Sequence, residues 1–120
     1  TCNFEATVRG LEFLDTQIAE LIREAHTKKW RVFVTADHGN AEQMINLETD
    51  EIDTEHSINP VPLIVVDQAH KDFSRPFNPR VTGVLADVAP TILDLMGVAI
   101  PAQMTGYSLT SALGFKALAQ

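Results

Sequence analysis

The stretch WRVFVTADHGN, residues 30–40, decides the fold class of this chain. Its first half is short and rich in β-branched and aromatic residues, which predicts a strand buried on both faces, as in a parallel sheet. The apolar character stops abruptly at Asp37-His38-Gly39. A second strand of the same kind is predicted over residues 60–66, where the two prolines stand at the beginning and do least harm to pairing.

Helical patterns stand on either side of these two strands. Apolar residues recur at spacings of three and four from Phe4 to Ala25, which predicts an amphipathic helix that Asn3 could cap. A further helix is predicted after Asp87 as N-cap, with Pro90 in its first turn and Gly97 as its stop, and its apolar face takes in residues from Leu85 to Met96. Residues 41–47 favour one or two helical turns.

These patterns together indicate the α/β class, with a mainly parallel sheet flanked by helices. A parallel sheet needs more strands than these two, so we expect the remaining strands to lie outside this chain. The sequence also opens on Thr1 without an initiator methionine, which suggests a piece of a longer protein.

Composition narrows the function classes. The chain has 120 residues, a formal net charge of −7 and 45% hydrophobic residues, so a disordered acidic tail is excluded. The negative net charge argues against nucleic-acid binding, which requires a basic face. The sequence contains no apolar run near the roughly 20 residues that span a bilayer. Its single cysteine, Cys2, cannot form an internal disulfide, which favours a reducing compartment.

Asp37 and His38 are the first candidate functional residues, because ligands bind at the carboxyl ends of strands in open α/β sheets. A carboxylate oxygen beside an imidazole nitrogen suits Zn²⁺ or Mn²⁺, and Gly39 permits the turn that would let both reach one ion. The alternative is that Asp37 starts a turn and His38 is an ordinary surface residue. From the residues alone both interpretations stay open.

His56 follows an acidic stretch and precedes the second strand, so a loop could return it to the same sheet edge. Its alternative is a solvated loop histidine. The acidic stretch itself, residues 48–55, is interpreted as a solvated surface, and His26 as a partner of its helix dipole. Ser57 and Thr35 are possible nucleophiles, but neither stands in a recognisable motif.

Four blocks carry a resemblance to a known family: VTADHGNAEQM (34–44), NPVPLI (59–64), VLADVAPTILDLMGV (84–98) and MTGYSL (104–109). In this order they resemble cofactor-independent phosphoglycerate mutase, a member of the alkaline phosphatase superfamily. The block around Asp37 and His38 is the most specific, because other members of the superfamily share Asp-His-Gly but not the residues that follow.

The resemblance implies a two-metal enzyme that interconverts 3-phosphoglycerate and 2-phosphoglycerate through a phosphoserine. It implies two Mn²⁺ ions, with Zn²⁺ or Mg²⁺ as alternatives, and no organic cofactor. Asp37 and His38 match the ligands of the metal nearer the serine, and His56 matches a ligand of the second metal. The nucleophilic serine and the other ligands are expected upstream. Asp53 stands where many members have His, and Tyr107 where many have Arg.

We therefore expect residues 1–120 to be the C-terminal portion of a phosphatase-like domain, inactive by itself. Expected partners are a small phosphoglycerate substrate and the remainder of the same polypeptide, with no nucleic acid or membrane. The parent protein is expected to be cytoplasmic and monomeric. The alternatives are a fragment of a phosphopentomutase or phosphatase, or a non-catalytic binding or assembly module.

Overall fold

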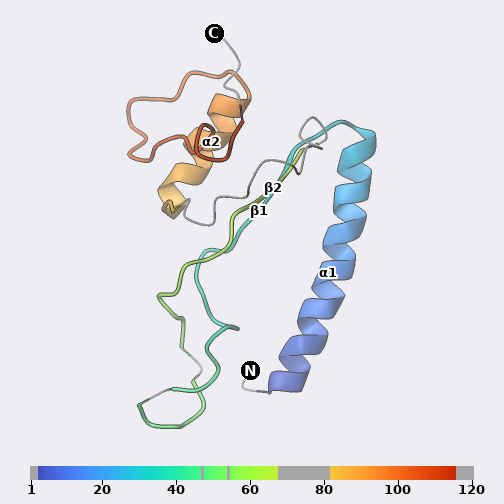
Figure 1. Ribbon diagram of the computed structural model, residues 1–120, viewed down its shortest axis with the longest axis vertical. Coiled ribbons are helices and arrows are strands. Elements are labelled where there is room, and N and C mark those ends of the chain that lie inside the picture. The colour runs from blue at the N-terminus through green and yellow to red at the C-terminus, as the bar shows by residue number, and fades with distance from the viewer. Residues whose placement is uncertain (1–2, 47, 54, 68–81, 116–120) are drawn as a thin grey trace. The chain divides into compact units, whose positions relative to one another are not determined.

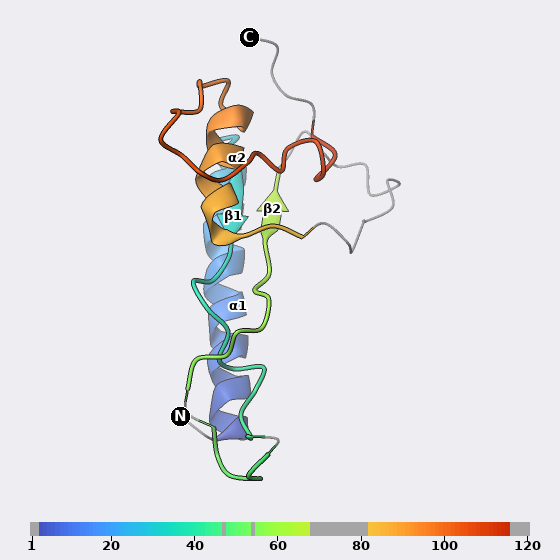
Figure 2. The same ribbon diagram turned by 90° about the vertical axis from the view of Figure 1, so that its left-hand side faces the viewer.

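The structure, a computed structural model, describes residues 3–46, 48–53, 55–67 and 82–115 (Figures 1 and 2). The chain divides into two compact units, residues 1–73 and 74–120. The element order is α1, β1, β2, a 3₁₀ turn η1 and α2.

The first unit begins with the long helix α1, Phe4–Thr27. Asn3 caps it as predicted, because its side-chain oxygen accepts a hydrogen bond from the Ala6 amide at 3.0 Å. The helix ends where Lys29 adopts a left-handed conformation with φ of 57° and the Trp30 amide returns to the Ala25 carbonyl. Its boundaries thus follow from local signals that the sequence contains.

The apolar stripe of α1 is largely exposed. Ala25 is its one buried residue, whereas Phe4 is 71% and Leu21 68% exposed. A hydrophobic stripe on an amphipathic helix normally faces a core. Along most of α1, the described part of the chain offers no such core. The helix is long enough to cross a bilayer but too polar to do so, and no other described helix qualifies.

Strands β1, Val32–Val34, and β2, Ile64–Val66, lie within the two predicted segments and pair side by side (Figures 1 and 2). They pair antiparallel, with Phe33 opposite Val65. The predicted parallel arrangement is therefore not seen in this pair, the one sheet of the described residues. The two strands are only partly buried, and Ile64 is 52% exposed, so the expected burial on both faces is not seen either.

The chain between the strands explains their direction. Parallel strands need a crossover connection, usually a helix, whereas antiparallel strands can be joined by a chain that simply turns back. The predicted helical turns at 41–47 are wrong for the described residues 41–46, which form a turn and a bridge from Ile45 to Ile52. A second bridge joins Gly39 to Ser57. The segment thus folds back on itself like a long, irregular hairpin.

The second unit is built on α2, Val88–Leu95, which follows the 3₁₀ turn η1, Leu85–Asp87. Gly97 ends the helix as predicted, with φ of 67° and the Val98 amide bonded to the Leu93 carbonyl. Asp87 stands at the predicted N-cap, but its side chain makes no cap hydrogen bond to α2. Its carboxylate instead accepts from the amides of Val84 and Tyr107, both at 2.8 Å.

The core of the second unit contains a buried polar link between α2 and the segment that follows it. Thr91, which is fully buried, donates its hydroxyl to the Asp87 carbonyl and accepts from the Leu109 amide at 2.9 Å. Asp94 accepts from the hydroxyl of Ser108. These bonds attach residues 107–109 along the helix and satisfy polar groups that burial would otherwise penalise.

Candidate metal centre

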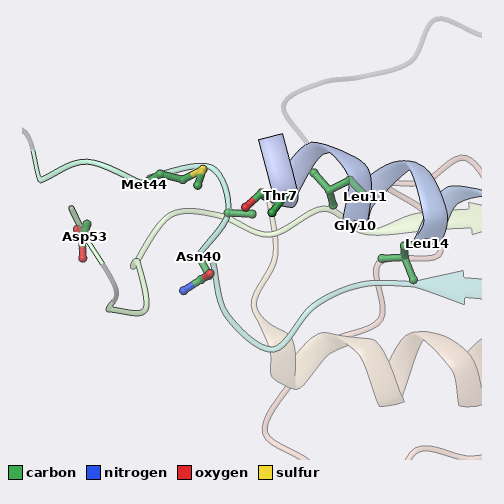
Figure 3. Close-up of a pocket in the computed structure, with 9 residues that line it drawn as sticks. Thr7, Gly10, Leu11, Leu14, Asn40, Met44 and Asp53 are labelled. Carbon is green, nitrogen blue, oxygen red and sulfur yellow. The ribbon is translucent and has the colours of Figure 1, made fainter. Parts of the chain in front are cut away.

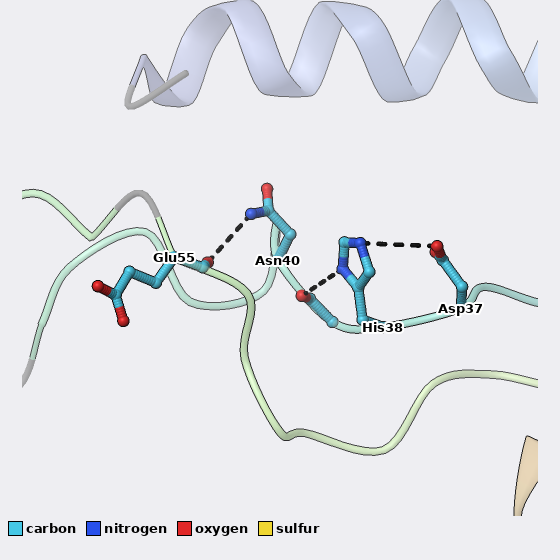
Figure 4. A network of polar contacts seen from close by, with 5 residues as sticks. Asp37, His38, Asn40 and Glu55 are labelled. Carbon is cyan, nitrogen blue, oxygen red and sulfur yellow. Dashed lines mark hydrogen bonds and ion pairs between the residues drawn. The ribbon is translucent and has the colours of Figure 1, made fainter.

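The loop after β1 carries the two leading candidates, Asp37 and His38. Nδ1 of His38 lies 3.0 Å from the Gly39 carbonyl oxygen (Figure 4). A carbonyl can only accept, so this contact requires the proton on Nδ1 and leaves the Nε2 lone pair available in the neutral ring. Nε2 lies 3.7 Å from Oδ2 of Asp37. In the neutral ring, two acceptors therefore face each other across a short gap, whereas in the protonated ring the same contact is an ion pair.

This gap fits a shared cation. Zinc-type ligand distances of about 2.1 Å at a tetrahedral angle put two ligand atoms roughly 3.4 Å apart, close to the 3.7 Å observed between Nε2 and Oδ2. The Asp37 side chain is 87% exposed, and that of His38 38%, so both can be reached from solvent. The donor chemistry of this pair therefore suits a divalent metal.

His56 is brought to the same place by the antiparallel bridge between Gly39 and Ser57. The Ser57 amide donates to the Gly39 carbonyl at 3.0 Å, which makes His38 and His56 diagonal neighbours on one face of the pairing. Their rings stack with centroids 3.7 Å apart and an interplanar angle of 17°. The three predicted residues thus lie together, in two segments far apart along the chain.

The stacking also limits what the three residues can do together. Imidazole lone pairs lie in the ring plane, so two nearly parallel rings direct them side by side rather than toward one point. Accordingly, no group of three potential ligands converges on one position within the described residues. The arrangement suits two adjacent ions better than one shared ion.

Glu42 is a functional candidate that the sequence patterns did not single out. Its Oε2 accepts from the Asn40 amide at 2.8 Å, and its Oε1 accepts from the Asn59 side chain at 3.1 Å and from the Ser57 hydroxyl. The hydrogen bond from Ser57, together with backbone hydrogen bonds, lowers the pKa of Glu42 from 4.5 to about 2. Its only signal in the sequence was its place in the specific block 34–44.

Among the described residues of the acidic stretch, 48–53 and 55, no group that could hold a metal ion is formed. Asp53 accepts from the Gln43 side chain at 3.0 Å, and Glu55 contributes its backbone carbonyl to the Asn40 side chain (Figure 4). This agrees with a surface segment. Tyr107, the other departure from the family pattern, is 81% exposed and contacts Asp87 through its amide. Any residue except proline supplies that amide.

A cavity of about 280 Å³ also lies in the first unit, where the N-terminal half of α1 meets the segment from Asn40 to Asp53 (Figure 3). Leu11, Leu14 and Met44 supply apolar lining, and Thr7 adds a hydroxyl. Asp37, His38 and His56 do not line it. The cavity is therefore separate from the candidate metal centre.

Comparison with known proteins identifies the family. A profile of the metalloenzyme superfamily matches residues 1–100. The chain belongs to the metalloenzyme superfamily. This membership agrees with a geometry in which a carboxylate and an imidazole face each other.

Within this superfamily the chain is similar to proteins named 2,3-bisphosphoglycerate-independent phosphoglycerate mutase. The relative from Clostridioides difficile is 43% identical over 92% of this chain. Those from Vesicomyosocius okutanii and Pseudomonas aeruginosa are each 42% identical, over 88% and 90% of it. The resemblance read from the motifs is thus confirmed. The chain spans only 20–21% of the length of these relatives.

Superfamily membership supports the expected α/β class. The described residues contain one two-stranded antiparallel sheet and do not show the expected parallel sheet. Metal dependence follows from the same membership. The match to one fifth of each relative agrees with the expectation that this sequence corresponds to part of a longer enzyme.

Proposed function

We propose that this chain is the part of a cofactor-independent phosphoglycerate mutase that supplies three of its metal ligands. Asp37 and His38 would hold one divalent cation, and His56 would hold a second. The observation that carries the proposal is the placement of the three side chains: Oδ2 of Asp37 faces Nε2 of His38 at 3.7 Å, and the His56 ring stacks on His38. The two ions, Mn²⁺ in our proposal, would supply Lewis-acid stabilisation of phosphoryl charge.

The residues of this chain would hold the metal ions and orient the ligand atoms that bind them. The Gly39 carbonyl fixes the His38 tautomer through Nδ1, which directs the unprotonated Nε2 toward Asp37. His56 comes from the other segment, and the bridge between Gly39 and Ser57 places it on the same face of the pairing as His38. The serine that carries the phosphoryl group would come from residues outside this chain, as would the groups that bind the glycerate.

The reaction we propose for the whole protein is the interconversion of 3-phosphoglycerate and 2-phosphoglycerate. Residues 1–120 would form the C-terminal portion of its phosphatase-like domain. We further propose a cytoplasmic, monomeric enzyme without an organic cofactor. The support is the set of similar mutases, together with block 34–44, which contains the Asp-His pair.

An assay of the longer polypeptide that contains this chain tests the proposal. We expect conversion of 3-phosphoglycerate without added 2,3-bisphosphoglycerate, and loss of that conversion on chelation or in Asp37→Asn and His38→Ala. His26→Ala, which removes an imidazole from the last turn of α1, is the matched control and should stay active. Release of inorganic phosphate alone would contradict the proposal and indicate a phosphatase. Isomerisation of a pentose phosphate alone would contradict it and indicate a phosphopentomutase.

A second experiment tests the metal ligands on this chain directly. Substoichiometric Mn²⁺ should broaden the ring proton resonances of His38 and His56 before those of His26. Broadening of His26 first, or of all imidazoles equally, would count against the assigned ligands.

A further inference from the structure

The proposed ligands lie on two segments that pair as β1 and β2 on one side and at the bridge from Ile45 to Ile52 on the other, with few bonds between them at the level of the histidines. His38 belongs to the loop after β1, and His56 follows the acidic turn. Between the loop and residues 55–57, the described backbone–backbone link is the single bond from the Ser57 amide to the Gly39 carbonyl. The Asn40 side chain adds a bond to the Glu55 carbonyl. An isolated bridge of this kind lacks the ladder of bonds that fixes the register of a sheet.

One side chain bonds to both segments at once. The Glu42 carboxylate uses Oε2 for the Asn40 amide, two residues beyond His38, and Oε1 for the Ser57 hydroxyl and the Asn59 side chain, both beyond His56. Charge-assisted hydrogen bonds of this kind are about twice as strong as neutral ones. We call Glu42, Asn40, Ser57 and Asn59 the carboxylate clamp.

Gly39 provides the space in which this clamp forms. It is buried, and a Cβ atom built at this position would overlap the carboxylate of Glu42 and the hydroxyl of Ser57. A side chain here would therefore push the two clamp partners away. Gly39, next to His38, thus leaves the space that the Glu42 carboxylate and the Ser57 hydroxyl occupy.

We propose that Glu42 is a positioning residue that holds His56 against His38 through the carboxylate clamp. It touches neither a substrate nor a metal in this proposal, and it acts through the segments that carry the ligands. The hydrogen bonds of Glu42 to both segments are independent of any metal. Its relevance to metal binding rests on the proposed function.

The chemistry requires a carboxylate in particular. Three donors converge on Glu42, and a carboxylate has two oxygens to accept them. Glutamine has the same shape but only one acceptor oxygen, and its NH₂ group would face a donor. Glu42→Gln should therefore open the clamp without removing side-chain volume.

The test compares Glu42→Gln with Glu48→Gln, a matched control at an exposed position in the separate turn at residues 48–49. The first readout needs no metal: nuclear Overhauser contacts between the His38 and His56 rings should be lost in Glu42→Gln and kept in Glu48→Gln. Contacts that persist in Glu42→Gln would overturn the proposal. Ser57→Ala removes one donor and should weaken the contacts, which gives a second test should Glu42→Gln unfold.

The second readout separates positioning from general stability. With Mn²⁺, the wild-type chain should show broadening of both rings, whereas Glu42→Gln should keep it at His38, beside Asp37, and lose it at His56. Loss at both rings, with the helical circular dichroism of α1 unchanged, would contradict the positioning role. If Mn²⁺ broadens neither ring in the wild-type chain, the proposed metal function fails while the metal-free contacts still decide the role of Glu42.

Discussion

The imidazole rings of His38 and His56 stack with centroids 3.7 Å apart, although one ring follows β1 and the other precedes β2. This relationship depends on the antiparallel bridge between Gly39 and Ser57, which places the two histidines on one face. A parallel connection would have needed a crossover between the segments. The direction of the chain between the strands therefore determines whether the proposed ligands meet.

We expect no mutase turnover from this chain alone, even with saturating Mn²⁺. The proposed ligands number three, whereas even one structural zinc site usually takes about four. A coupled assay for 2-phosphoglycerate checks this, with an active phosphoglycerate mutase as the positive control. Clear turnover that disappears in Asp37→Asn would show that the chain is sufficient and that our assignment of missing groups is wrong.

The depressed pKa of Glu42 predicts a definite pH dependence of the carboxylate clamp. A carboxyl group whose folded pKa lies below its unfolded value stabilises the fold above the unfolded value and loses that contribution as the pH falls. For Glu42 the window runs from 4.5 down to about 2. The Glu42 side-chain and Ser57 amide resonances should titrate late, near the lower limit. Titration of Glu42 near 4.5, like an ordinary glutamate, would contradict the clamp.

Two glycine substitutions should have opposite effects. Gly10 lies in α1 with open space around its Cα, so Gly10→Ala should raise helix stability by about 0.5–1 kcal/mol. At Gly106 a Cβ would overlap the backbone carbonyl of Ala86, and Gly106→Ala should destabilise the second unit by roughly 1–3 kcal/mol. Thermal circular dichroism measures the first effect, and amide exchange of α2 measures the second. Equal effects at the two sites would refute the packing described around Gly106.

The buried hydroxyl of Thr91 should be needed for the second unit. Thr91→Val keeps the shape but leaves the Leu109 amide without its acceptor, at a cost of about 1–3 kcal/mol. Amide exchange at residues 107–110 should accelerate. Thr16→Val is the control, because Thr16 is exposed on α1 and bonds only to the Glu12 carbonyl of its own helix. A Thr91→Val variant as protected as the control would mean that the link between α2 and residues 107–109 is not formed.

Local signals determined much of the fold. The Asn3 cap and the spacing of apolar residues predicted α1, and Gly97 ended α2 where expected because only a residue tolerant of positive φ continues the chain there. The two β-branched segments were found at the right places. These features depend on residues within a few positions of one another, which is why the sequence alone reveals them.

Tertiary structure decided the direction of the strands, the stacking of His38 on His56 and the role of Glu42. Continuous apolar runs such as these are typical of buried parallel strands, but the same β-branched residues also form antiparallel pairs, so the sequence did not determine whether the chain crosses over or turns back. The hydrogen bonds from Ser57 and Asn59 to Glu42 join positions far apart in the sequence. The sequence by itself determined which side chains can bind a metal, whereas the folded chain decided which of them meet, because encounters between distant segments depend on the path of the backbone.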